Sequence, residues 1–151
     1  MTFLPLLITS AALLLSGATT PPTPAGSLSP TGKQAPPAAV HAAFAQRYAA
    51  ATGVKWEPEG AAWEAGFHLG KEELSAVFSA AGVFQEVERE VALTALPAPV
   101  LPYLRQHYAG QKVKEAARIE DAAGAVTWEA EVAGKDVLFD ATGKFLREAK
   151  D

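Results

Sequence analysis

The stretch VTWEAEVAGKDVLFDATGKFLRE, residues 126–148, decides the fold of this chain. Trp128, Ala130 and Val132 alternate with glutamates, the period of two that is typical of a strand with one buried face. A turn at Gly134 leads into a second apolar run, and the turn that ends at Gly143 fits a type I turn with a glycine bulge. The stretch therefore predicts an antiparallel meander.

The same order of features occurs about sixty residues earlier, and an internal repeat of this kind indicates a duplicated structural unit. In each copy an apolar stripe of helical period precedes the strands. We therefore predict an α+β domain in which a helix plus four antiparallel strands occurs twice, at about residues 39–93 and 97–150, with the helices on one face of the sheet. The matched positions are Val40, Phe44 and Tyr48 with Val100, Leu104 and Tyr108, Trp63 with Trp128, and Phe78, Gly82 and Phe84 with Phe139, Gly143 and Phe145.

The first 38 residues have a different character. Residues 1–18 are apolar and uncharged and end in small residues, which is typical of a secretory signal peptide cleaved near Ala18. A retained membrane anchor is the alternative. Residues 19–38 are rich in Pro, Thr and Ser and predict a disordered linker, leaving residues 39–151 as the folded domain. The expected location is periplasmic or secreted.

Composition excludes several classes of partner. The chain has 13 basic and 17 acidic residues, a net charge of −4, and no cysteine. Acids and bases are interspersed, which argues against a nucleic-acid surface and against binding to anionic lipid. We expect no stable membrane insertion after signal cleavage, while the oligomeric state stays open.

A family resemblance rests on residues 126–148, on the run from Val54 to Glu57, on the run from Trp63 to Phe67, and on Leu96 with Pro97. Together these resemble the PepSY-like domains of bacterial exported proteins, which are related in fold to the beta-lactamase inhibitory protein. The resemblance covers residue 40 to the C-terminus. It implies a non-enzymatic periplasmic or secreted protein that binds a protein or peptide on its exposed sheet face. Inhibition of a beta-lactamase does not follow from it.

This chain also departs from the family pattern. Trp63 and Trp128 stand where a tyrosine is common, and we expect both in the core. Ser79 and Ala80 stand where an acidic turn residue is usual, which argues against an essential carboxylate in that turn.

The helix-free face of the predicted sheet should be exposed and polar, and it is our candidate partner-binding surface. Glu86, Glu88 and Glu90 are interpreted as the solvated side of a strand. Trp56 has no aromatic counterpart in the second copy and is a candidate interface anchor, although a core position is the stronger interpretation. The candidate residues are Trp56, Glu64, His68, Lys114, Arg118, Glu129 and Glu131.

Catalytic, cofactor and metal sites are not expected. The three histidines have no metal-ligand spacing. Glu129 and Glu131 would lie about 7 Å apart on an open sheet, without the cleft that a glycosidase pair requires. The sequence therefore favours a binding module. A structural or accessory tethered domain without a specific ligand is the alternative, and an enzyme has the least support.

Overall fold

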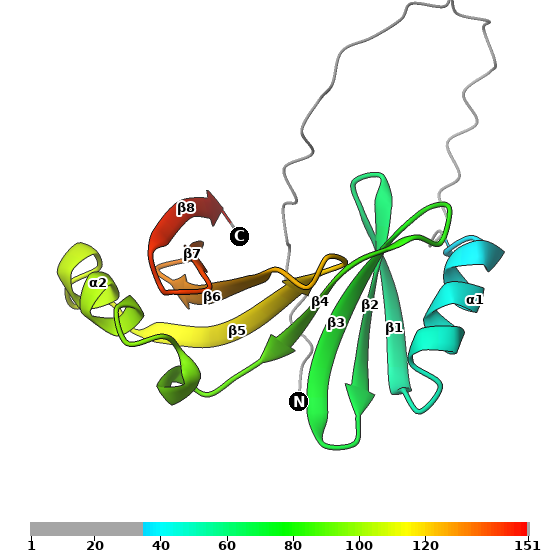
Figure 1. Ribbon diagram of the computed structural model, residues 1–151, viewed down its shortest axis with the longest axis horizontal. Helices are drawn as coiled ribbons and strands as arrows, with labels where there is room; N and C mark the ends of the chain where they lie inside the picture. Colours follow the sequence, from blue (N-terminus) through cyan, green and yellow to red (C-terminus); the bar gives the residue numbers. More distant parts are fainter. Residues whose placement is uncertain (1–34, 151) are drawn as a thin grey trace, which may run out of the picture.

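The computed structural model of the protein describes residues 35–150. The predicted signal peptide and most of the predicted linker lie outside the described residues. The described chain forms one eight-stranded antiparallel sheet with two α-helices and one short 3-10 helix (Figure 1). The elements are α1 (Ala38–Arg47), β1 (Thr52–Glu59), β2 (Ala62–Leu69), β3 (Glu72–Ser79), β4 (Phe84–Glu90), η1 (Leu93–Ala95), α2 (Val100–His107), β5 (Val113–Asp121), β6 (Val126–Val132), β7 (Lys135–Asp140) and β8 (Phe145–Lys150).

The sheet is a meander in which each strand pairs with its neighbours in the chain, in the order β1 to β8. Strand β4 pairs with β5 from Glu86 opposite Asp121 to Glu90 opposite Ala117. This pairing joins the two halves of the chain into one continuous sheet. The prediction of an α+β fold with antiparallel strands is confirmed.

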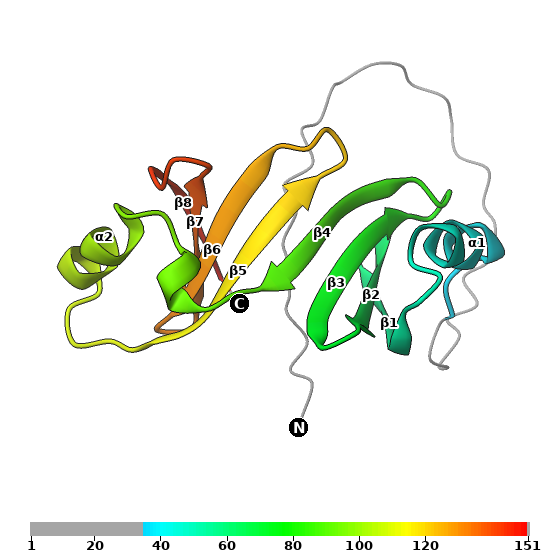
Figure 2. The same cartoon turned by 60° about the horizontal axis from the view of Figure 1, so that its bottom comes forward.

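Both helices pack on the same face of this sheet, which we call the helix face. Leu74 contributes to the core beneath α1 and Trp128 packs against the core beneath α2. The cross-strand pairs Leu74–Arg89, Arg89–Arg118 and Arg118–Trp128 connect these two positions across the sheet. Directly paired residues point to the same side, so one face carries both helices. The helices lie at opposite ends of the molecule (Figures 1 and 2).

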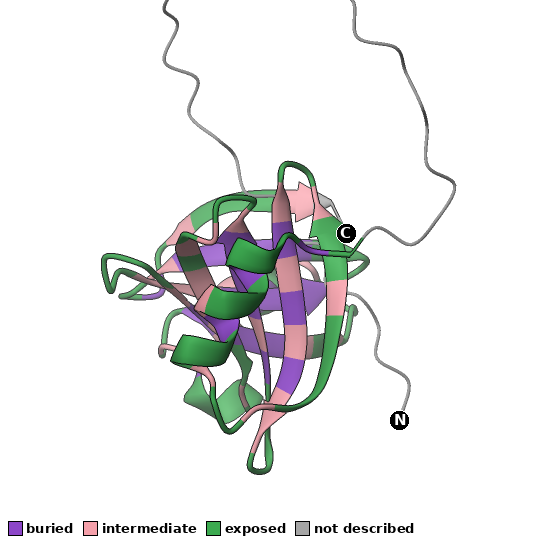
Figure 3. Ribbon diagram, turned by 90° about the vertical axis from the view of Figure 1, so that its right-hand side faces the viewer, coloured by how far each residue is buried: buried purple, intermediate pink, exposed green. Residues whose placement is uncertain are grey.

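Aromatic residues dominate the core beneath α1. The Phe44 ring lies 5.0 Å from that of Phe67, 5.2 Å from that of Trp56 and 6.2 Å from that of Phe78. Seen from the α1 end, buried and half-buried residues alternate along the strand behind the helix (Figure 3). Trp63 is buried and Trp128 packs against the core beneath α2, as predicted.

Two turn glycines fix each helix against the sheet. Gly82 and Gly143 have φ values of +80° and +87°, in the left-handed region that favours glycine. A Cβ on Gly82 would lie 2.5 Å from the backbone oxygen of Ala39, at the start of α1. A Cβ on Gly143 would lie 2.8 Å from Pro97 Cβ, just before α2. Both turns therefore need glycine for conformation and for close approach.

Candidate functional site

The face opposite the helices, which we call the inner face, is covered by none of the described helices. Although no helix lies over them, Val77, Ala117 and Leu138 on this face are only 1%, 2% and 6% exposed. The strands of the two halves run at a steep angle to each other, and β7 and β8 turn back above β5 (Figure 1). The twist therefore brings inner-face side chains together. Register places Glu57, Glu59, Glu64, Glu73, Glu86, Glu88, Glu90, Glu115, Glu129, Glu131 and Asp136 on this face.

Four of the candidate residues lie on the inner face, as the sequence predicted. Glu64 is opposite Val77 on β3, and His68 is opposite Glu73. Glu129 and Glu131 lie on β6, where Glu129 is opposite Leu138 and Glu131 is opposite Asp136 on β7.

The expectation that this face is exposed is wrong for the two β6 glutamates, because each is only 4% exposed. A flat sheet would leave them in water, whereas the twist buries them.

The Lys114 side chain also lies on the inner face, because a bulge interrupts the regular alternation of β5 at this residue. The β5–β6 register shifts between Val113 and Glu115, which leaves Lys114 at a bulge. Its Nζ lies 2.5 Å from Glu131 Oε1, and this carboxylate is buried while the lysine side chain is 58% exposed. Lys114 therefore neutralises one end of the acidic cluster.

Arg118 was predicted on the exposed face, and this is wrong. It lies opposite Trp128 on the helix face and forms a salt bridge to Glu120 at 2.8 Å. There it lines a hollow of about 370 Å³ together with Arg47 and Arg89, between the regions that the two helices cover.

Trp56 is likewise separate from the inner-face acids. It lies opposite Ala65 and its ring packs at 5.2 Å from both Phe44 and His41 on α1. The core interpretation of this tryptophan is the one that the packing supports.

The sequence interpretation missed Glu88 and Asp136, which are 4% and 3% exposed. Glu88 was assigned to the solvated side of β4, but it lies between Ser75 on β3 and Ile119 on β5, in the middle of the sheet. Its Oε2 atom is buried and has no hydrogen-bond partner among residues 35–150. A sequence signal existed, because Val77 and Leu138 are apolar although each alternates with a matched core position, Phe78 or Phe139.

Burial and mutual repulsion disfavour the charged forms of these carboxyls. Burial, reinforced by Asp136 and Glu115, raises the pKa of Glu129 to about 8. The pKa of Glu88 is raised well above its ordinary value by burial and then by the nearby Glu129. Burial also raises the pKa of Glu59 to about 7, with Glu64 and Glu86 adding to the effect. Part of the cluster therefore holds protons at neutral pH.

The chemistry available to this cluster is acceptance of protons, hydrogen-bond donors and positive charge. Within residues 35–150, no group of three or more His, Asp or Glu is arranged to hold a metal ion. His41, His68 and His107 lie on α1, β2 and α2 and do not meet.

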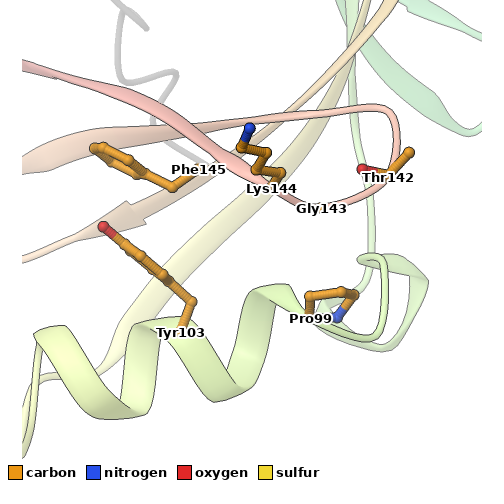
Figure 4. Close-up of a pocket in the computed structure, with 6 residues that line it drawn as sticks. All are labelled: Pro99, Tyr103, Thr142, Gly143, Lys144 and Phe145. Carbon is orange, nitrogen blue, oxygen red and sulfur yellow. The ribbon is translucent and has the colours of Figure 1, made fainter.

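A separate hollow of about 540 Å³ lies where the β7–β8 turn approaches α2 (Figure 4). Pro99 and Tyr103 line it from the helix side, and the residues from Thr142 to Phe145 line it from the turn. Tyr103 stacks on Phe145 with ring centroids 5.1 Å apart. These side chains supply apolar packing, and Lys144 is the charged residue among them, so this hollow has no paired acid and base.

Comparison with known proteins identifies the fold. No family model and no curated protein matches the sequence. Among solved structures, a BLIP-like protein from Bacteroides fragilis is 26% identical with a TM-score of 0.62, over 80% of this chain and 89% of that chain. A candidate periplasmic protein from Bacteroides eggerthii is 18% identical with a TM-score of 0.68, over 78% of this chain and 90% of that chain. A DUF2874 family protein from Bacteroides uniformis is 20% identical with a TM-score of 0.65, over 76% and 88%.

None of the described helices is long and apolar enough to cross a membrane. The similarity spans most of each solved chain, and the described sheet and helices therefore have a BLIP-like fold.

Proposed function

We propose that this chain is an exported, non-enzymatic binding module that holds a protein or peptide partner on its inner face. The observation that carries the proposal is the buried, acidic inner face itself. Buried polar atoms in native proteins nearly always have a hydrogen-bond partner, and Glu88 Oε2 has none within the described chain. A partner supplying donors to this face would remove that cost.

The comparisons support this proposal at the level of fold and compartment. The solved relatives include a BLIP-like protein and a candidate periplasmic protein. We propose the same compartment here, reached through a signal peptide cleaved near Ala18, with the segment of residues 19–38, rich in Pro, Thr and Ser, as the linker. Membership of the PepSY-like family is part of the same proposal.

The proposal also includes a duplicated α-β-β-β-β unit. Tyr48 and Tyr108 end their helices with φ/ψ of −126°/53° and −127°/46°. The tyrosine N–H donates to Phe44 O in one half and to Leu104 O in the other, at 2.8 Å in both. Gly82 and Gly143 each contact the start of their own helix. These matches support two copies of one unit placed side by side in one sheet.

Site-specific photo-crosslinking tests the binding proposal in cells that produce the full chain. A photoreactive phenylalanine would replace Glu90 or Arg147, which are exposed positions of the inner face. The matched controls replace Ala42 and Gln46, which are exposed on α1. We expect a discrete adduct from the inner-face positions and none from α1.

An inner-face position that gives no adduct, or gives the same adducts as α1, would contradict the proposal. That result would favour a structural or accessory domain without a specific ligand.

A further inference from the structure

The inner face concentrates negative charge far beyond the chain as a whole. The net charge of the chain is −4, yet most of its 17 acidic residues lie on this one face by register. The basic side chains on the same face are Lys55, Lys114 and Arg147. The other arginines discussed above lie on the helix face, so the two sides of the sheet differ in charge.

Acidic groups from four strands surround the centre of the inner face. Glu88 on β4 and Glu129 on β6 are both 4% exposed and flank β5. The charged groups that act on one or both of them are Glu64 on β2, Glu86 on β4, Glu115 on β5, Asp136 on β7 and Arg147 on β8, while Ser75 lies directly opposite Glu88.

Arg147 is the basic member of this set, and it is exposed. It favours ionisation of Glu129, but it is outweighed by burial and the surrounding carboxyls.

One end of the cluster shows how such carboxylates are satisfied. The Lys114 side chain is largely exposed, and its ammonium lies 2.5 Å from the buried Glu131. Charge-assisted contacts of this kind are roughly twice as strong as neutral hydrogen bonds. Within the described residues, no ion pair of this kind is formed at Glu88 or Glu129.

We propose that the partner inserts a cationic side chain, an arginine or a lysine, between Glu88 and Glu129, and that it displaces protons as it binds. This inference rests on the proposed function and names the chemistry of the partner. Positive charge between two carboxyls stabilises their ionised forms, so each carboxyl that ionises on binding gives its proton to the buffer. Affinity should therefore rise with pH, by up to about tenfold per pH unit for each proton displaced.

A peptide series tests this with the folded protein. The probes are tetra-arginine, tetralysine and tetracitrulline peptides, where citrulline has the shape of arginine without its charge. Isothermal titration calorimetry at pH 6 and pH 8, in buffers of different ionisation enthalpy, measures both affinity and protons released. We expect the cationic peptides to bind, with affinity at pH 8 at least tenfold above that at pH 6 and a heat that depends on the buffer.

Substitutions separate a specific socket from diffuse attraction. Glu88→Gln and Glu129→Gln should each weaken tetra-arginine binding at least tenfold. The matched control is Glu73→Gln, which removes an exposed carboxylate from the same face and should change affinity less than twofold. Circular dichroism confirms that each variant is folded. Equal effects of all three substitutions, or equal binding of tetracitrulline, would overturn the inference.

The outcome also separates this inference from the proposed function. If the photoreactive residue at position 90 crosslinks a partner while tetra-arginine binds no better than tetracitrulline, the face binds its partner by another chemistry. In that case only the inference of a cationic side chain between Glu88 and Glu129 is refuted. If crosslinking fails as well, both proposals are lost.

Discussion

Tyr48 and Tyr108 end their helices in nearly the same backbone conformation, yet their hydroxyls have different partners. Tyr48 accepts a hydrogen bond from Arg47 Nε at 3.3 Å, whereas Tyr108 donates to Glu148 on β8. At this position α1 and α2 thus share their backbone conformation and differ in the polar contact of the side chain. The backbone at this position is set by the end of the helix, and the side-chain contact is set by the strand or helix residue nearby.

The cores of the two halves show the same contrast. The residue that α1 inserts is Phe44, which meets the rings of Phe67, Phe78 and Trp56. Its counterpart on α2 is Leu104, which packs among Val132 and Val137. Both cores contain edge-to-face aromatic contacts, such as Tyr103 with Phe139 beneath α2, and they differ in the side chain that the helix inserts, a phenylalanine from α1 and a leucine from α2.

The largest effect is expected from truncating these two helix anchors. Phe44→Ala should cost about 3–5 kcal/mol and Leu104→Ala about 2–4 kcal/mol of unfolding free energy, because each leaves a cavity in a packed core. Gln46→Ala, exposed on α1, is the control and should cost less than about 0.5 kcal/mol. Urea denaturation measures all three, and a Phe44→Ala cost near that of Gln46→Ala would refute the packing described.

The turn glycines come next and compare the halves directly. Gly82→Ala and Gly143→Ala should each cost about 2–4 kcal/mol, because left-handed strain of about 1–2 kcal/mol adds to a steric clash. Gly82 should be the more sensitive, since its Cβ would meet backbone rather than a proline side chain. The control is Gly60→Ala. Gly60 has a φ of +58° and no atom near its added Cβ, so this substitution should cost only the left-handed backbone strain. Thermal denaturation that ranks Gly60→Ala equal to the others would contradict the role of close approach.

The acidic inner face predicts an unusual dependence of stability on pH. The pKa of Glu129 is raised in the folded state to about 8, so its contribution is fully present below the ordinary glutamate pKa and is lost as pH rises towards 8. Glu129→Gln should remove this loss and be more stable than wild type by up to about 4 kcal/mol at pH 8, with little difference at pH 4. Urea midpoints at the two pH values measure it, and a variant that is less stable at pH 8 would refute the assignment.

The smallest effect concerns the turns that differ between the halves. Asp140 Oδ1 accepts hydrogen bonds from the N–H groups of Thr142 and Lys144, at 2.9 and 3.0 Å, whereas the equivalent Ser79 Oγ accepts one from Val83 N at 3.2 Å. The Thr142 hydroxyl and these N–H groups lower the pKa of Asp140. Its contribution is therefore present above the ordinary aspartate pKa and disappears as pH falls through the lowered folded-state pKa.

Asp140→Asn should lower Tm by a few degrees at pH 7 and leave it unchanged near pH 2. A Tm difference that persists unchanged in acid would show that the carboxylate charge is not responsible. The converse substitution, Ser79→Asp, should raise Tm slightly by giving the first half the turn of the second.

Much of the fold could be predicted from the sequence because local residue patterns specify it. Period-two alternation marked the strands around Trp63 and Trp128, and the glycines at 82 and 143 marked turns, where the structure gives both a positive φ. The pairing of β4 with β5 could not be predicted, because the connection between them contains α2. No local pattern specifies which strands pair when the segment between them is that long.

The candidate site was harder to predict from the sequence, for two physical reasons. Strand parity assigns a side chain to a face but cannot say whether twist closes that face, so Glu88 and Glu129 were placed in solvent. A bulge near Lys114 also interrupts the alternation of side chains along β5, so Lys114 contacts Glu131 on the inner face. Ala116 and Arg118, which share its parity, lie on the helix face. Ala116, an apolar residue between two basic ones, was the signal that the helix face lay on that side.

The order of strands has a consequence for how the chain acquires its structure. Every strand hydrogen-bonds only to strands adjacent to it in sequence, so the described sheet can grow from one end by adding one hairpin at a time. Short loops carry a small closure entropy, and proteins rich in local contacts fold faster than those with distant pairings. A chain that emerges from a pore N-terminus first could build α1 and β1–β4 before β8 has arrived, and β4 would then serve as the template for the second half.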